Sequence, residues 1–434
     1  QAQSSSQGWF GFSQLHSSVC HRYPCNHGAV ASNYVNILRK PGAFKFSATG
    51  LLARMPMSMV SISSLLAIQS EYHSYTLAGQ VSAVTLIAFA CTAPWLARRV
   101  DIYGQRFMIP FITTSCLAMV GEIVSITFHA HPAALLVCAA IAGGTSGSMG
   151  ALVRARWSNL LETPDEIHTA FALEAAMDEV AFIVGPILAT MLVTNPPLPV
   201  TSGLIVAVSA QAVGSLWFLS QRATEPPAKG RAAVQEQAGQ SHVLRNGALV
   251  VTALTCLVLG GLFGANDVAI VASATEHGHK NLSGAILACF STGSLVAALI
   301  HGSRQWHWPL QRQFVVGVTV LALGASTLIF APNLWFVAVA AAITGMAIAP
   351  TFTTANQIVQ HSVADNQITE GLTWLSTTIN VGVSVGTFLA GLAIDSSGAH
   401  GGFLAVTVMA WLAVVIVWSG ARTLRRTLGV RQIP

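Results

Sequence analysis

The sequence predicts an all-α membrane protein with twelve transmembrane helices in two pseudo-symmetric six-helix bundles. Three observations support this fold class: the composition, the spacing of the apolar runs and the placement of the positive charges. The 434 residues are 53% hydrophobic and only 9% charged, with a mean hydropathy of +0.61. Soluble domains carry about 25% charged residues. A water-soluble fold could not bury this much apolar surface, so the chain is expected in a lipid bilayer.

The apolar runs are long enough to cross a bilayer, which takes about 20 mostly apolar residues. Twelve runs are expected, near 44–69, 77–97, 107–128, 133–156, 168–194, 200–220, 246–273, 282–301, 313–331, 334–358, 371–394 and 402–420. The long polar connection at 221–245 divides them six and six. The chain is therefore expected to comprise a polar tail (1–43), a first bundle (44–220), a linker (221–245), a second bundle (246–420) and a basic tail (421–434).

The positive charges predict the orientation, because cytoplasmic loops carry an excess of Lys and Arg. With the N-terminus in the cytoplasm, all 21 Lys and Arg residues fall on the inner side except two. Lys280 falls in an outer loop, and Arg54 lies inside the first helix. Both termini are therefore expected in the cytoplasm, with the chain in the cell (inner) membrane.

The two halves of the sequence also look related. Residues 165–189, shifted by 201 positions, fall on 366–390 without a gap. The shift pairs Gly185 with Gly386 and maps the fifth helix onto the eleventh. Internal repeats of this kind are typical of secondary transporters.

The polar stretch PWLARRVDIYGQR separates the second apolar run from the third. It resembles the loop signature of the major facilitator superfamily, roughly G-x-L-A-D-R-x-G-R-K. Leu96 and Ala97 precede a core made of Asp101, Gly104 and Arg106. The leading glycine is missing, and extra residues separate the two parts. The resemblance covers the helical region from about 44 to 420 and implies the major facilitator fold.

In that family the loop locks the two halves together on the cytoplasmic side. The resemblance thus implies a cytoplasmic gate made of Arg99, Asp101, Gly104 and Arg106. A carboxylate is favoured at the positive N-terminal end of a helix, and neighbouring arginines hold it there. The alternative is a positively charged anchor beside lipid headgroups. The corresponding segment of the second half, 301–312, keeps arginines but lacks the aspartate.

The fifth run contains AFIVGPILA, which resembles the G-x-x-x-G-P-x-x-G-G pattern of proton-coupled antiporters. Gly185 and Pro186 match the pattern and would form an antiporter-like helix bend, whereas Ala181 and Ala189 replace glycines. The alternative is a kinked packing helix with no part in coupling. The basic motif that the superfamily's drug–proton antiporters carry on the fourth helix is absent, which weakens that specific assignment.

Charged residues inside the apolar runs are the candidate functional groups, since each costs about 2.5–3.5 kcal/mol near the bilayer centre. We expect Arg54 to pair with Asp178, with Glu174 as the next partner. The candidates for proton coupling are Asp178, Glu174, Glu179 and Asp267. The candidates for the substrate cavity are Arg54, Asp267, Thr353, Thr354, Asn356 and Gln357. Some of these pairs and polar groups could equally serve structure alone, and Glu122 is expected to snorkel or to bond locally.

Several functions are not expected. The sequence has no phosphate-binding G-x-x-x-x-G-K loop and no H-E-x-x-H motif, so no enzyme activity, cofactor or metal site is expected. Cys20 and Cys25 lie in a histidine-bearing tail whose spacing fits no standard zinc pattern, and disorder is the preferred interpretation.

The preferred function is proton-coupled export of a small organic compound by alternating access, by a monomer that contacts lipid and binds no nucleic acid. The alternatives are an importer or uniporter of a metabolite such as a sugar, and a non-transporting receptor or assembly protein on the same fold.

Overall fold

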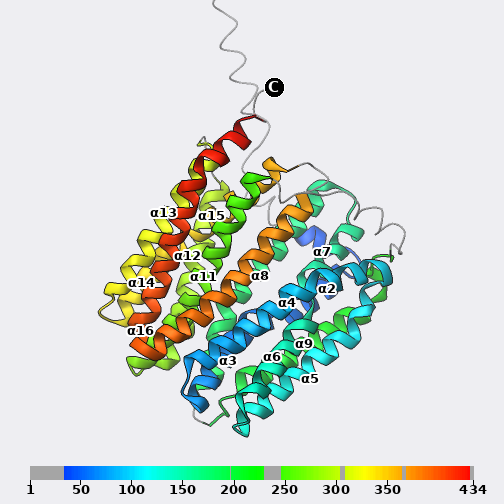
Figure 1. Cartoon of the computed structure of the whole chain (residues 1–434). Helices are drawn as coiled ribbons and strands as arrows, with labels where there is room; N and C mark the ends of the chain where they lie inside the picture. The colour runs from blue at the N-terminus through cyan, green and yellow to red at the C-terminus, as the bar shows by residue number, and fades with distance from the viewer. Residues whose placement is uncertain (1–33, 196, 229–245, 304–307, 364–367, 431–434) are drawn as a thin grey trace, which may run out of the picture.

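The structure, a computed structural model, describes residues 34–195, 197–228, 246–303, 308–363 and 368–430 (Figure 1). Among these residues, eleven helices are long and apolar enough to cross a membrane. The last one, α16 (Ile368–Val430), is far longer than one crossing needs. Gly398 interrupts it with φ 66° and ψ −163°, so α16 supplies two crossings and the expected all-α fold class is confirmed. The expected tail with Cys20 and Cys25 lies outside the described residues.

Six crossings precede the linker. They are α2 (Ala43–Arg54) with α3 (Pro56–Tyr72), α4 (Tyr75–Tyr103), η1 (Gln105–Phe107) with α5 (Met108–Thr127), α6 (Pro132–Ser146) with α7 (Met149–Leu160), α8 (Pro164–Thr194) and α9 (Ser202–Ser220). The first crossing is divided because Pro56 starts a new helix directly after α2. The fourth is divided at Gly147, whose φ of 64° is left-handed.

Six crossings follow the linker, whose beginning forms η2 (Arg222–Thr224). They are α11 (Gly247–Glu276), η4 (Lys280–Leu282) with α12 (Ser283–Ser303), α13 (Leu310–Thr327) with η5 (Leu328–Phe330), α14 (Leu334–Gly345) with α15 (Ile348–Ser362), and the two parts of α16. The expected linker residues 229–245 lie outside the described part of the chain.

The two halves meet along two helix pairs, α4 with α16 and α8 with α12. At both contacts glycines let the main chains approach closely. A Cβ atom on Gly391 of α16 would lie 2.5 Å from the carbonyl oxygen of Tyr75, and one on Gly284 of α12 would lie 2.3 Å from that of Pro186. The second crossing of each half thus packs against the fifth crossing of the other.

The glycines that the sequence comparison pairs occupy equivalent places in the two halves. A Cβ atom on Gly185 would meet Ser58 on α3, and one on Gly386 would meet the carbonyl oxygen of Gly261 on α11. Both α3 and α11 belong to the first crossing of their half. The weak sequence repeat therefore corresponds to a repeated helix contact.

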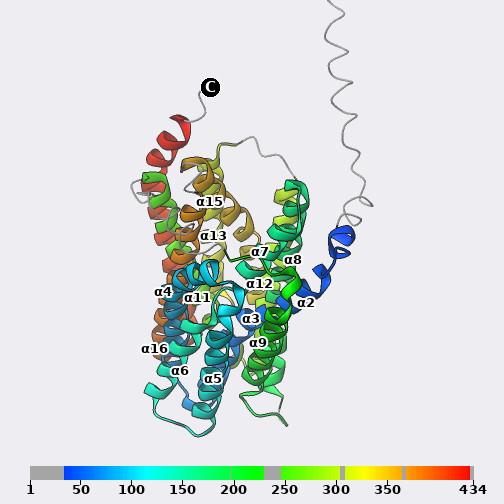
Figure 2. The same ribbon diagram turned by 90° about the vertical axis from the view of Figure 1, so that its right-hand side faces the viewer.

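The bundle has two ends, which Figures 1 and 2 show at opposite extremes of the long helices. We call the end with the turns at His73, Gly278 and Gly398 the distal end. The other, which carries Gly104 and η2, is the linker end.

One expectation is corrected at the linker end. The stretch PWLARRVDIYGQR was expected to be a loop, yet α4 continues through Tyr103. Pro94 removes one main-chain donor without ending the helix, as is tolerated in membrane helices. The chain turns only at Gly104, with φ 88° and ψ 167°. Arg99 and Asp101 therefore lie on the last turns of a helix.

Candidate functional site

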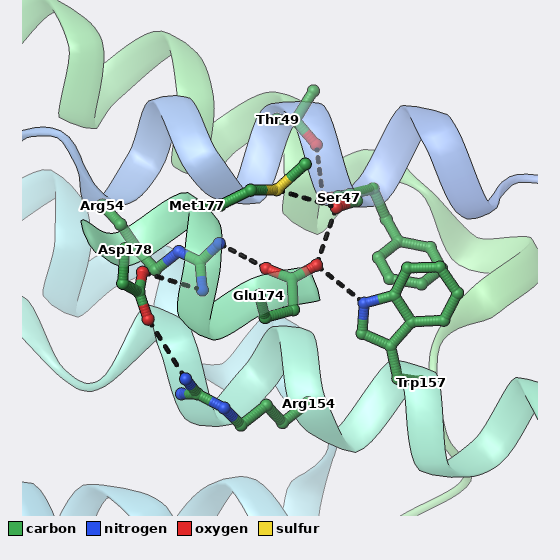
Figure 3. Close-up of polar contacts among 9 residues, drawn as sticks. Ser47, Thr49, Arg54, Arg154, Trp157, Glu174, Met177 and Asp178 are labelled. Atoms are coloured by element: carbon green, nitrogen blue, oxygen red, sulfur yellow. Dashed lines mark hydrogen bonds and ion pairs between the residues drawn. The ribbon is translucent and has the colours of Figure 1, made fainter. Parts of the chain in front are cut away.

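Four charged side chains form one network inside the first half (Figure 3). Arg54 Nη2 donates to Glu174 Oε2, and Arg54 Nη1 lies 3.2 Å from Asp178 Oδ1. Arg154 Nη2 donates to Asp178 Oδ2 at 3.1 Å. The expected pairing of Arg54 with Asp178 is present, and Glu174 binds the same arginine. Two positive and two negative groups make the network neutral, a condition for keeping charges in an apolar environment.

The local fold explains why these groups meet. Arg54 is the last residue of α2, at the break before α3, so its side chain projects where the helix changes direction. Glu174 and Asp178 lie four residues apart on α8 and hence on one face of that helix. Arg154 projects from α7 on the other side of Asp178 (Figure 3).

Glu174 is the fixed member of the network. Its side chain is 0% exposed and accepts hydrogen bonds from Ser47 Oγ and Trp157 Nε1, each at 2.7 Å, besides that from Arg54. Trp157 is itself fully buried, with its ring centroid 4.7 Å from that of Phe46. Sequence reasoning missed Ser47 and Trp157, because nothing in their spacing relates them to Glu174.

Asp178 is the accessible member. Its side chain is 28% exposed, and that of Arg154 is 36% exposed, whereas that of Arg54 is 2% exposed. Glu179, the next residue, makes no hydrogen bond or ion pair with the described residues and stays outside the network. Asp178 is therefore the carboxylate that a proton or a ligand can reach.

Pro186 marks where α8 meets the second half, whereas Gly185 faces Ser58 on α3 of the first half. The helix continues through Pro186 to Thr194 without interruption. The Pro186 carbonyl oxygen faces Gly284 of α12, as described above. The sequence motif thus coincides with an inter-half contact.

Two residues of the expected gate, Arg99 and Arg106, contact groups of the first half and of the start of the linker. The Arg106 main-chain N–H donates to Glu225 Oε1 at 3.3 Å, and the Arg99 guanidinium lies 5.1 Å from the ring centre of Trp95. Asp101 is exposed at the end of α4. The gate across the halves remains a prediction.

A buried polar cluster beside this turn was missed from the sequence. Gln105 donates to the Leu152 carbonyl oxygen at 3.0 Å, and its Oε1 accepts from Arg156 Nε at 2.8 Å. Arg156 Nη1 donates to Thr224 Oγ1 at 2.9 Å and to the Gln221 carbonyl oxygen at 3.0 Å. The cluster fastens the start of the linker to the first half. No local motif predicts it, because Arg156 resembles an ordinary inner-side charge.

The structure leaves Asp267 apart from the network in the first half. It lies on α11, is partly exposed and has no hydrogen-bond or ion-pair partner among the described residues. Of the polar residues expected on the tenth crossing, Thr354 is buried and bonds the Pro350 carbonyl oxygen of its own helix at 2.7 Å. The other three are exposed or partly exposed: Thr353, Asn356 and Gln357.

Of the two expectations for Glu122, snorkelling or local bonding, the first is wrong, and its bond goes to a neighbouring helix. It is 2% exposed and accepts a hydrogen bond from Ser64 Oγ of α3 at 2.6 Å. The bond joins α5 to the first crossing, so the third crossing is less peripheral at this depth than the sequence suggests.

At the distal end, a carboxylate of the second half caps a helix of the first half. Asp395 of α16 accepts from the main-chain N–H groups of Tyr75 at 2.9 Å and Thr76 at 2.8 Å, and from Ser74 Oγ at 3.1 Å. These groups form the N-terminus of α4, where the helix dipole favours a negative charge.

A lysine of the second half caps the neighbouring helix end. Lys280 Nζ donates to the Leu66 carbonyl oxygen at 3.2 Å and to Gln69 Oε1 at 2.8 Å, near the C-terminus of α3. A cation is favoured there by the same dipole. Both charges therefore hold the α3–α4 hairpin from the opposite half, and neither contact was anticipated from the sequence.

The sequence matches the Major Facilitator Superfamily over residues 46–271 and 263–432. The chain belongs to this superfamily. It is a multi-pass membrane protein with the fold of the superfamily's transporters, and no curated protein matches its sequence.

Solved structures agree in fold at low sequence identity. A variant of the nucleoside transporter NupG is 12% identical with a TM-score of 0.68, covering 87% of this chain and 99% of its own. A bacterial homologue of the human lysosomal transporter Spinster, in an inward-facing and unoccupied conformation, is 12% identical with a TM-score of 0.67, covering 93% and 99%. A bacterial homologue of the iron transporter ferroportin, in an inward-facing state, is 12% identical with a TM-score of 0.64, covering 87% and 99%.

Proposed function

We propose that the chain is a secondary active transporter that exports a small organic compound in exchange for protons by alternating access. The observation that carries this proposal is the sharing of Arg54 between two carboxylates of unequal exposure. One of them is sealed and fully bonded, whereas the other is accessible. This arrangement lets one carboxylate change its protonation state while the arginine stays paired.

Asp178 binds the coupling proton in this proposal. Protonation removes its attraction for Arg54 and Arg154, and Glu174 alone then neutralises Arg54. The buried guanidinium is never left without a counter-charge, which would be costly in an apolar site. Arg154, whose side chain is 36% exposed, is then released from Asp178 and can change its contacts. Glu174 is the alternative proton carrier, although its side chain is 0% exposed and protonating it would weaken its bond with Arg54.

The access pathway follows from the inter-half contacts described at the distal end. With the linker end in the cytoplasm, as the positive charges predict, the distal contacts close the outer side. The residues Arg99, Asp101, Gly104 and Arg106 would lock the inner side when the transporter turns outward. The substrate would lie between the halves, within reach of Asp267 and of the polar side of α15, whereas Arg54, at 2% exposure, is covered in this conformation.

Replacing Asp178 by Asn tests the coupling role. In purified, folded protein in vesicles, Asp178→Asn should abolish transport driven by a pH gradient but leave substrate counterflow. Glu162→Gln, an exposed acid just before α8, is the matched control and should retain both. Intact pH-driven transport in Asp178→Asn would remove this residue from the mechanism.

A purely structural network predicts a different outcome. Asp178→Asn would then lower the amount of folded protein, and neutralising Arg154 as well would restore it. The same vesicles also test direction, because an importer would accumulate substrate under an inward proton gradient. Absence of any substrate flux across a panel of compounds would favour a receptor or an assembly protein.

A further inference from the structure

α11 is buried along most of its length, with one short accessible stripe. Between Val258 and Ala274 every residue is buried except Phe263 and Asp267. These two are four positions apart and lie next to each other on one face of the helix. An aromatic ring and a carboxylate therefore share the accessible face of an otherwise enclosed helix.

This face looks toward other protein helices rather than toward lipid. The Phe263 ring centroid lies 5.8 Å from that of Phe290 on α12, in an edge-to-face arrangement. It lies 5.6 Å from that of Phe352 on α15. Three helices of the second half thus bring their rings together one turn from Asp267.

Asp267 lacks the partners that Glu122 and the carboxylates of the first-half network have, although Glu179 in the first half is likewise unpaired among the described residues. Glu122 is bonded to Ser64, and the first-half network pairs each of its carboxylates with an arginine. Asp267 has no partner among the described residues, and the side-chain nitrogen of the neighbouring Asn266, 1% exposed, is unpaired as well. Because the arginines of the first-half network are already neutralised, Asp267 gives the accessible face of α11 a net negative charge.

We propose that Asp267 and the ring cluster of Phe263, Phe290 and Phe352 bind the transported substrate, and that this substrate is an organic monocation with an apolar or aromatic body. The carboxylate balances the positive charge. The rings contact the apolar body, and their faces favour a cation. This assignment rests on the proposed transport function and names its substrate class.

Two probes of equal shape and opposite charge test the assignment directly. Tetraphenylphosphonium and tetraphenylborate are offered to the purified full-length protein, and binding is measured by equilibrium dialysis. We expect binding of the phosphonium only. Asp267→Asn should weaken it by at least about tenfold, and Phe263→Ala by a smaller factor. The matched control is Glu122→Gln, a buried acid whose amide can keep the Ser64 bond, and it should bind like the wild type.

A second measurement avoids the variants altogether. Dicyclohexylcarbodiimide attacks accessible carboxyl groups in apolar surroundings, and mass spectrometry locates the adduct. Asp267 should be modified in the wild type, and tetraphenylphosphonium should protect it. Lack of protection, equal binding of both probes, or unchanged binding in folded Asp267→Asn would each overturn the assignment. So would a wild type that binds neither tetraphenylphosphonium nor the smaller benzyltrimethylammonium.

The outcome is separable from that of the proposed function. Proton coupling is measured by pH-driven transport in the wild type, and the substrate site by phosphonium binding to Asp267→Asn. Loss of binding in Asp267→Asn without any pH-driven transport by the wild type would support the site and refute proton coupling. pH-driven transport by the wild type together with unchanged phosphonium binding in Asp267→Asn would support proton coupling and refute the site.

Discussion

The two ends of the bundle are held together differently. At the distal end, Asp395 and Lys280 of the second half bond to helix termini of the first half. At the linker end, Arg156 and Gln105 bond within the first half and to the start of the linker. The distal contacts must break if the halves are to separate there. The linker-end cluster can stay intact while the halves move. The described contacts thus distinguish a distal interface that would have to break for the halves to separate from a linker-end cluster that would not.

Removing Arg156 should have the largest effect on stability and none on the distal contact. Arg156→Ala leaves the side-chain oxygens of Gln105 and Thr224 buried without their donor and should destabilise the protein by about 3 kcal/mol. Denaturant unfolding in detergent measures this, with the exposed Arg222→Ala as control. Hydrogen exchange of the Tyr75 and Thr76 amides should stay at the wild-type rate. Faster exchange there would mean that the two ends are coupled.

A methyl group at the inter-half glycine should loosen the distal end. In Gly391→Ala the new Cβ would lie 2.5 Å from a main-chain oxygen, so the helices must separate, at a cost of about 1–3 kcal/mol. The Tyr75 and Thr76 amides should then exchange faster. Gly144→Ala, where the nearest atoms are 3.7 Å away, is the matched control and should exchange like the wild type. Equal rates in both variants would contradict the close packing of α4 on α16.

Removing the cap at the distal end should have a smaller effect. Asp395→Ala deletes the acceptor for two amides and should weaken the closed distal end by about 1 kcal/mol, the usual value of a helix cap. Asp395→Asn keeps one acceptor oxygen and should fall between the alanine variant and the wild type. Their rank order in amide exchange at Tyr75 and Thr76 is the measurement. Faster exchange in Asp395→Asn than in Asp395→Ala would argue against a cap.

The smallest effect concerns an ion pair of the first half near the linker end. The hydrogen bond from Lys40, helped by its charge and by Thr163, holds the pKa of Glu166 below its usual value of 4.5. A lowered carboxyl pKa stabilises the folded state above the unfolded pKa, and this contribution is lost as pH falls through the folded value. Unfolding free energy should therefore drop slightly less steeply below pH 4.5 in Glu166→Gln than in the wild type. Distal amide exchange in the variant should match that of the wild type at each pH.

The sequence predicts the helices better than their ends and breaks. Apolar runs alone locate the crossings, because the bilayer sets the required length. The sequence predicts that the second run ends near residue 97, before the charged segment. Arginines extend a helix as readily as they start a loop, however, and only Gly104 turns the chain. The tenth crossing divides after Gly345, and the one local sign of this is Pro350, which lies in the first turn of α15 and cannot donate to the preceding turn.

The candidate site was predictable where charge is scarce. Arg54, Glu174 and Asp178 stand out in apolar sequence, and the need to neutralise them predicts their pairing. The partners Ser47 and Trp157 are ordinary residues whose role depends on which helix faces meet. Asp395 and Lys280 escaped notice for a related reason, since their contacts exist only between halves that are far apart in sequence.

The glycine contacts between the halves have an evolutionary consequence. Gly79, Gly284 and Gly391 face main-chain oxygens, so the interface is specified by the lack of a side chain rather than by matching side chains. Main-chain atoms are the same in every protein, and such a contact places no demand on the identity of the opposing residue. Substitutions can therefore accumulate over most of the chain while the halves keep their geometry.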